Sequence, residues 1–207
     1  GLAQQPMQRD LLLCQGRAAL SMGKANEALN SFSKAEPGAA TANDRLLVHL
    51  FKGNAYKALG EYAEAQASYQ AALLLAQQEK NQKFQVIASL LSGEALVQQS
   101  SLSEAQGYYE SALKLAGNNN ERADVNEHLA QLKAKQGRYD DAIAYQVKAL
   151  VMQASDGDFD SYANAGLELG FLYIGAKDFS SAEKNLNKII EKAKGAGDGY
   201  WVAKGYY

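Results

Sequence analysis

A short residue pattern recurs five times along the chain at a nearly constant interval, and it restricts the fold more than any other feature. The clearest copy occupies residues 53–72 and reads GNAYKALGEYAEAQASYQAA. A small alanine marks the same place in all five copies, at positions 28, 65, 105, 142 and 182, so the copies are 37, 40, 37 and 40 residues apart. A period of this length is typical of stacked supersecondary units, none of which can bury its own apolar face alone.

Each copy predicts a helical hairpin. Gly53 and Tyr56 are three residues apart, and Ala65 and Tyr69 are four apart, so each pair lies on one face of a helix. A small residue lets two helices approach closely, and an aromatic ring fills the space beside it. Gly60 is predicted to end the first helix, because glycine enters a left-handed turn at little cost.

The same pattern, extended over the chain, predicts helices throughout. The 207 residues include only 2 prolines, which also favours helices. The expected helices cover residues 6–22, 25–35, 41–59, 62–79, 82–99, 102–116, 120–136, 139–154, 158–175 and 179–194, and a further helix begins near Tyr200.

The string Gly-x-x-Tyr…Gly-x-Tyr-x-x-Ala…Tyr-x-x-Ala resembles the tetratricopeptide repeat (TPR), and the resemblance covers about residues 9–194. The spacing resembles the extended-repeat branch, with repeats of about 40 residues, to which kinesin light chains and various bacterial regulators are similar. This resemblance implies an all-α fold: a right-handed α–α superhelix (TPR solenoid) of about five helical hairpins plus a partial sixth. We expect one domain over residues 1–207, with repeats at about 9–40, 41–81, 82–119, 120–157 and 158–197, and residues 198–207 starting a further helix.

The resemblance also implies a concave groove, lined by the first helix of each hairpin, that binds a protein or peptide segment. Helical spacing from the small residue of each first helix predicts the residues that line it. These are Arg17, Leu50, Asn54, Lys57, Leu90, Glu94, Glu127, Gln131, Leu167 and Phe171, with the last stripe continuing to Ile174. The leucines have a second interpretation, in which they pack against the adjacent hairpin and only the polar members face solvent.

Asn54 is the most specific of these predictions. In extended TPR proteins an asparagine after this glycine often hydrogen-bonds the backbone of a bound peptide, and its amide can both donate and accept. The corresponding residues of the other copies are Arg17, Glu94, Gln131 and Phe171, so a continuous asparagine ladder is absent.

Few residues in the sequence favour a metal site or a catalytic site. His49 and His128 lack the spacing of metal ligands, and Cys14, the only cysteine, is interpreted as a small packed hydrophobe. The acidic run at residues 156–160 imitates a calcium loop but lacks its glycine and its bidentate glutamate, so a helix cap is the better interpretation. We therefore predict no metal, no cofactor and no catalytic residue. The enzyme alternative would depend on Glu94 and Glu127, its only plausible carboxylate pair.

Charge and hydropathy restrict the classes of partner and the cellular location that we expect. The formal net charge is −2, which argues against nucleic-acid binding, and no apolar run is long enough to span a bilayer. A cytoplasmic location is expected. Because the sequence lacks an initiator methionine, removal of a leader would make it periplasmic instead.

The aromatic end of the sequence allows two expectations. Trp201, Tyr206 and Tyr207 lie on a final helix with no expected partner, which indicates a piece cut from a longer protein or self-association through this end. The sequence thus predicts a non-enzymatic scaffold that binds a protein or peptide in its groove. The alternative is a sensory or regulatory module of a larger bacterial signalling protein, truncated at residue 207.

Overall fold

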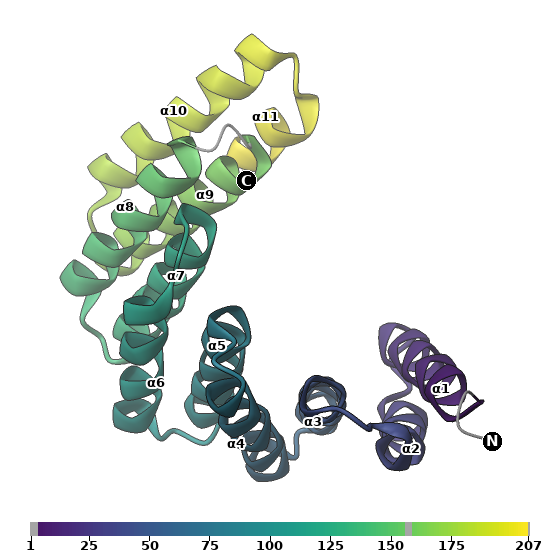
Figure 1. Ribbon diagram of the computed structural model, residues 1–207. Helices are drawn as coiled ribbons and strands as arrows, with labels where there is room; N and C mark the ends of the chain where they lie inside the picture. Colours follow the sequence, from purple (N-terminus) through teal and green to yellow (C-terminus); the bar gives the residue numbers. More distant parts are fainter. Residues whose placement is uncertain (1–3, 156–158, 207) are drawn as a thin grey trace. The chain divides into compact units, whose positions relative to one another are not determined.

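The computed structural model describes residues 4–155 and 159–206, and over this part of the chain the fold is helical without strands (Figure 1). The helices are α1 (Gln4–Ser21), α2 (Ala25–Ala35), α3 (Ala42–Leu59), α4 (Tyr62–Gln78), α5 (Gln82–Gln98), α6 (Leu102–Leu115), α7 (Asn119–Lys135), α8 (Tyr139–Ser155), α9 (Phe159–Gly175), α10 (Phe179–Ala196) and α11 (Gly199–Tyr206). The all-α prediction is confirmed, and the predicted helix ends agree with these bounds to within about two residues.

Two local features were not expected. A 3₁₀ turn at Glu36–Gly38 joins α2 to α3, where Pro37 suits the first turn because it has no N–H to satisfy. Gly60 ends α3 in the left-handed region at φ 78°, as predicted. In two other hairpins a residue with a side chain takes this conformation, Ser100 at φ 63° and Lys177 at φ 62°.

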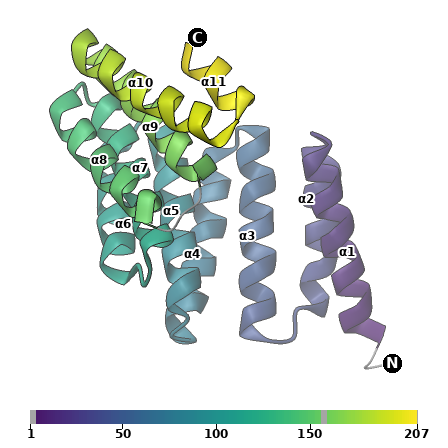
Figure 2. The ribbon, with the colours of Figure 1, turned by 90° about the horizontal axis from the view of Figure 1, so that it is seen from above.

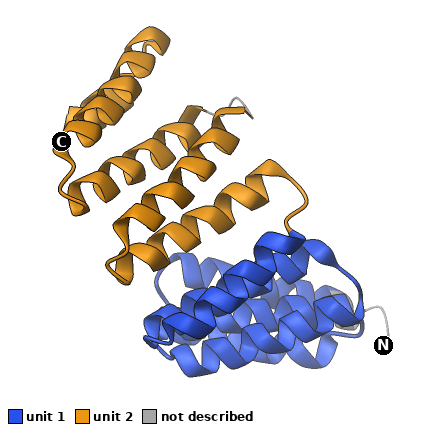
Figure 3. Cartoon of the chain, turned by 90° about the vertical axis from the view of Figure 1, so that its left-hand side faces the viewer, with its two compact units in different colours: residues 1–115 blue, residues 116–207 orange. Residues whose placement is uncertain are grey.

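The chain divides into two compact units, residues 1–115 (unit 1) and residues 116–207 (unit 2) (Figure 3). Unit 1 contains α1 to α6 and unit 2 contains α7 to α11. In each unit, helices that follow one another in sequence pack together, as hairpins that share apolar surface should. The assignment of residues 1–207 to one domain with five repeats stays a prediction.

The core of unit 1 is built on contacts between a glycine and an aromatic ring. Tyr69 of α4 is fully buried against Gly53 of α3, and these two helices run side by side (Figure 2). A Cβ atom on Gly53 would lie 2.6 Å from the ring atom Cδ1 of Tyr69. Two further pairs repeat this contact, Gly16 with Phe32 and Gly93 with Tyr109. The predicted role of the small residue and the aromatic is therefore confirmed.

Unit 2 uses aliphatic side chains at the equivalent close contacts. Gly166 meets Ile189, and Gly170 meets Leu186. The expectation that the last helix lacks a partner is wrong, because α11 packs against α10 and Trp201 is buried at 4% exposure. The indole Nε1–H of Trp201 donates a hydrogen bond of 2.6 Å to Asp160 of α9, which satisfies its polar atom inside the core.

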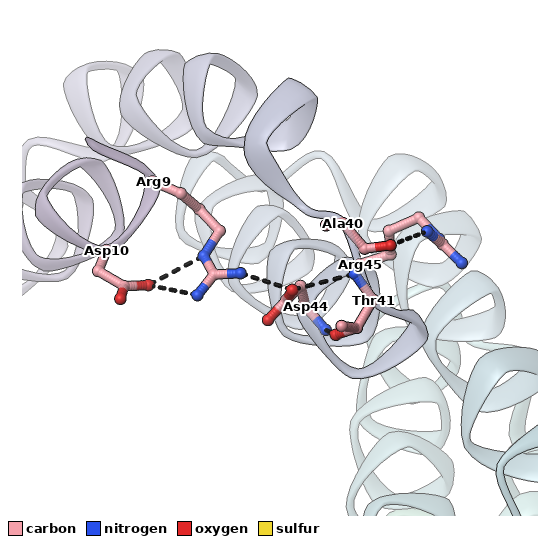
Figure 4. Close-up of polar contacts among 6 residues, drawn as sticks. All are labelled: Arg9, Asp10, Ala40, Thr41, Asp44 and Arg45. Atoms are coloured by element: carbon pink, nitrogen blue, oxygen red, sulfur yellow. Dashed lines mark hydrogen bonds and ion pairs between the residues drawn. The ribbon is translucent and has the colours of Figure 1, made fainter. Parts of the chain in front are cut away.

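A cluster of charged and polar side chains ties α1 to the start of α3 (Figure 4). The Thr41 hydroxyl accepts a hydrogen bond of 3.1 Å from the Asp44 backbone N–H, and the Asp44 carboxylate accepts one of 3.0 Å from the Thr41 N–H. This reciprocal arrangement is a capping box. The same carboxylate forms an ion pair with Arg9, which also binds Asp10. One side chain of α1 thus holds the N-terminus of α3 in place.

This cluster predicts a dependence of stability on pH. Partial burial would raise the pKa of Asp44, but the hydrogen bonds from Thr41 and the charge of Arg9 outweigh it, so the pKa lies below its usual value. A depressed pKa means that the stabilisation is fully present above the unfolded-state pKa, about 4, and is lost as the pH falls through the folded-state pKa.

We expect Asp44→Asn to lower the free energy of unfolding by about 1 kcal/mol at neutral pH, the usual contribution of a cap. The difference from wild type should shrink as the pH falls below about 4. Urea denaturation at a series of pH values measures this difference in the free energy of unfolding. Asn43→Ala, an exposed change in the same turn, provides the control, and an Asp44→Asn deficit that stayed constant down to acid pH would contradict the prediction.

Candidate peptide-binding faces

The predicted groove residues fall into two sets, one on each unit. Those of unit 1, called the unit 1 face, lie on α1, α3 and α5 and are Arg17, Leu50, Asn54, Lys57, Leu90 and Glu94. Those of unit 2, called the unit 2 face, lie on α7 and α9 and are Glu127, Gln131, Leu167 and Phe171. All ten come from the first helix of a hairpin.

On the unit 1 face, Asn54 is held by the aromatic core. The Tyr69 hydroxyl donates a hydrogen bond of 2.8 Å to Asn54 Oδ1. Burial, together with the negative charge of Glu94, raises the pKa of Tyr69, so its hydroxyl remains a donor at neutral pH. One of the two acceptor lone pairs of the Asn54 amide oxygen is thereby used. From the sequence, Tyr69 was predicted only as a core residue, since it is the fold that brings Tyr69 and Asn54 together.

An ion pair joins two successive first helices on the same face. Lys57 Nζ on α3 lies 2.7 Å from Glu94 Oε2 on α5. Both side chains are about one-third exposed, at 35% and 30%. A partly exposed pair of this kind contributes little stability, because solvent screens it and both side chains lose rotamer freedom. Its charges therefore remain open to exchange with charged groups of a ligand.

The remaining unit 1 residues differ in exposure. Leu50 and Leu90 are buried, each at 6% exposure, so they offer little surface to a ligand. For these two residues the structure agrees with packing inside the hairpin stack. Arg17 is exposed, and its guanidinium carbon lies 5.7 Å from the centre of the Phe51 ring on α3. The accessible part of the unit 1 face is thus mainly polar and charged.

The unit 2 face combines a half-buried acid with exposed apolar side chains. Burial raises the pKa of Glu127, the nearby carboxylates Asp124 and Glu168 add to this, and a hydrogen bond from Gln153 opposes it. That bond, from Gln153 Nε2 to Glu127 Oε1, is 2.8 Å long. Burial disfavours the charged form of Glu127, so a cationic partner would stabilise this carboxylate more than it would stabilise a carboxylate in water.

Phe171 is the largest apolar side chain exposed on this face. It is 55% exposed, Ile174 is 44% exposed, and Leu167 is half-buried. These three residues follow one another at intervals of four and three along α9, so they form a continuous apolar stripe. Gln131 on α7 is exposed as well.

The carboxylates of the enzyme alternative each have a partner on their own unit, since Glu94 pairs with Lys57 and Glu127 accepts from Gln153. In the described part of the chain no group of three or more His, Cys, Asp or Glu side chains is placed to hold a metal. His128 Nδ1 lies 2.8 Å from the backbone carbonyl of Asp124. His49 is half-buried on α3, and desolvation lowers its pKa.

Cys14 and the acidic run at residues 156–160 were two further sequence-based expectations. Cys14 was expected to be packed, and this is wrong: it is exposed, because the buried side of α1 carries Leu13, Gly16 and Ala19 instead. Asp156 and Asp158 of the acidic run lie outside the described residues, while Asp160 binds the Trp201 indole. No helix in the described segments combines the length and apolarity needed to cross a membrane.

Comparison with solved structures identifies similar folds at low sequence identity. A crystal structure of BtubC (BKLC) from P. vanneervenii is 17% identical with a TM-score of 0.76, and the match covers 97% of this chain and 93% of that chain. The crystal structure of aspartyl phosphate phosphatase F from Bacillus subtilis is 14% identical with a TM-score of 0.87, covering 100% and 56%. The Rap conjugation gene regulator of the plasmid pLS20, in complex with the Phr* peptide, is 17% identical with a TM-score of 0.71, covering 94% and 55%.

Sequence comparison gives the family. No curated protein sequence matches this chain significantly. A family model described as tetratricopeptide repeat matches residues 50–120 and residues 90–159, which together make up more than half of the chain. The matched region includes the glycine–tyrosine contacts of α3 to α6, where the pattern of small and aromatic residues is clearest. From this match and the stacked hairpins of both units, the chain belongs to the tetratricopeptide repeat family.

Proposed function

We propose that the chain is a non-enzymatic scaffold that binds a protein or peptide segment on the faces of its first helices. Each face has a distinct chemistry. The unit 1 face would recognise the backbone and the charged groups of the ligand, and the unit 2 face would bind an apolar side chain of the ligand. The Rap regulator with its Phr* peptide, similar in fold, supports a peptide as the ligand.

On the unit 1 face, Asn54 would contact the ligand backbone. Its Oδ1 already accepts from Tyr69, so the amide NH₂ is the group for a ligand carbonyl. Lys57 and Glu94 would fix the register, each by exchanging part of its ion pair for a charged ligand group. Arg17 would supply a further positive charge at the α1 side of this face.

The observation that carries the proposal is the exposure of Phe171 at a position selected from the repeat pattern. A phenylalanine that is 55% exposed loses contact with water when a ligand covers it, and this is favourable. Aromatic side chains are also common among the residues that dominate binding energy at interfaces. Leu167 and Ile174 extend the apolar surface, and Glu127 places a carboxyl on the neighbouring helix.

A phage-displayed peptide library selected on the chain tests this proposal. We expect the selected peptides to bind in solution, and we expect Phe171→Ala to weaken their binding by about tenfold or more, the usual loss at a buried aromatic contact. Asn54→Ala should weaken the binding of those selected peptides that contact the unit 1 face. Fluorescence anisotropy with a labelled peptide measures both effects.

Phe179 provides a matched control. It is also a phenylalanine of unit 2, it is 65% exposed, and it lies at the start of the second helix α10 rather than on a first helix. Phe179→Ala should leave the affinity unchanged. Equal affinity of the Phe171 and Phe179 variants, or selected peptides that bind neither face, would show the proposal to be wrong.

A regulatory module of a larger bacterial signalling protein is the second candidate. Its support is that this chain corresponds to just over half of the Rap regulator and of aspartyl phosphate phosphatase F. The same faces would then bind a regulatory peptide. The sequence of the complete gene distinguishes the two, since an output domain next to these residues would favour the module.

A further inference from the structure

Helix α1 lies at one end of unit 1 (Figure 1), and an apolar stripe runs along its exposed side. We call it the α1 stripe, and its members are Met7, Leu11, Cys14, Ala18 and Met22, the last of which directly follows the helix. All are exposed, with Met7 at 74%, Leu11 at 58% and Met22 at 63%. Their spacing of four, three, four and four residues keeps them on one side of the helix. Nothing in the described residues covers them.

We propose that the α1 stripe binds the α1 stripe of a second copy of this chain, with the two helices antiparallel. The stripe is self-complementary in this direction. When the two-fold axis passes between residues 14 and 15, Leu11 faces Ala18 of the other copy, so a large side chain meets a small one on each side. Met7 then faces the other copy's Met22. Self-complementarity of a single patch is what a two-fold interface requires.

The charges beside the stripe favour the same direction. Asp10 and Arg17 are exposed and seven residues apart, so they lie on the same flank of the stripe. In the antiparallel pair, Asp10 lies within about 3 Å, measured along the helix axis, of the other copy's Arg17. In a parallel pair each residue would face its own equivalent, which places like charges together. Arg17 has to leave the half-buried Phe51 ring to make this contact, and a cation–π contact made by an exposed cation is weak.

Cys14 lies next to the two-fold axis. Two copies of this residue are offset by about 1.5 Å along the axis, so their sulfur atoms come close together. Five side chains from each copy make a small interface, and interfaces below about 1,200 Å² in total are weak or transient. We therefore expect a dimer that dissociates on dilution.

Cross-linking of Cys14 tests the proposal in the intact chain. The sequence has one cysteine, so any cross-linked dimer joins Cys14 to Cys14. A short bismaleimide should give a cross-linked dimer in good yield, and sedimentation should show a dimer that increases with concentration. Leu11→Lys should raise the dimer dissociation constant by about tenfold or more. Leu74→Lys is the matched control, because Leu74 is 57% exposed on α4 of the same unit, and it should have no effect.

Exchange of the charges tests the direction of pairing. Asp10→Arg should weaken the dimer, because two arginines then lie opposite each other, and addition of Arg17→Asp should restore it. A monomer at every concentration, or cross-linking no greater than in Leu11→Lys, would overturn the proposal. So would a dimer that Tyr206→Ser abolishes and Leu11→Lys does not, since that result places self-association at the aromatic C-terminal end. Peptide binding at the unit 2 face uses no residue of α1, so the dimer proposal can fail while the function proposed above stands.

Discussion

Replacement of Tyr69 by alanine is expected to lower the free energy of unfolding by about 3–5 kcal/mol, the range for deletion of a large aromatic from a core. The Tyr69 ring is fully buried between α3 and α4 and packs in the central apolar cluster of unit 1. Removal of the ring leaves a cavity beside Gly53, which has no side chain to fill it. It also removes the donor to Asn54.

Urea denaturation followed by far-UV circular dichroism measures this loss. Tyr69→Phe keeps the ring and removes the hydroxyl, so it should cost about 1 kcal/mol, the typical net value of one hydrogen bond. Tyr206→Ala, at a tyrosine that is 66% exposed, should shift stability by less than about 0.5 kcal/mol. A loss at Tyr69 as small as that at Tyr206 would show that the ring does not support the hairpin.

Substitution of alanine for Gly53 should destabilise the chain by about 1–3 kcal/mol, as overpacking of a core does. The added methyl group would lie 2.6 Å from Tyr69 Cδ1, far inside van der Waals contact. The ring cannot move away, because it is buried on all sides. The effect opposes the usual benefit of replacing a helical glycine by alanine, about 0.5–1 kcal/mol.

Gly107 on α6 provides a matched control for the substitution at Gly53. A Cβ atom there would have nothing within 4 Å, and the residue lies inside a helix and is exposed. Gly107→Ala should therefore stabilise the chain by about 0.5–1 kcal/mol. Thermal unfolding of the two variants should give midpoints that move in opposite directions. In the double variant Gly53→Ala with Tyr69→Ala the clash disappears, so the combined loss should be smaller than the sum.

These two predictions rest on contacts that the sequence already indicated. The spacing of Gly53, Ala65 and Tyr69 predicted two helices in close contact, and it predicted the helix ends because helical periodicity and the left-handed glycine are local signals. Not every left-handed turn of the chain is marked by a glycine, however. Ser100 and Lys177 adopt the same left-handed turn, because the packing of the hairpins imposes a conformation that their own preferences disfavour.

The candidate site was accessible to sequence reasoning only in part. Position along a helix gives the angular direction of a side chain, which is why Asn54 and Phe171 were selected. It does not give the depth at which the next hairpin covers that side chain. Leu50 and Leu167 were predicted at equivalent positions, yet Leu50 is only 6% exposed and Leu167 is half-buried. Coverage depends on how closely neighbouring helices approach, which is a property of the packed unit.

By itself, the sequence determined the helical hairpins, their order and the family, because a pattern repeated five times encodes local geometry in each copy. Only the tertiary structure decided which side chains remain exposed and which distant groups meet. It joined Tyr69 to Asn54, Lys57 to Glu94 and Trp201 to Asp160, and it turned Cys14 outward. The reason is that such contacts depend on distances between separate helices, and those distances are set by the whole packed core rather than by any short segment.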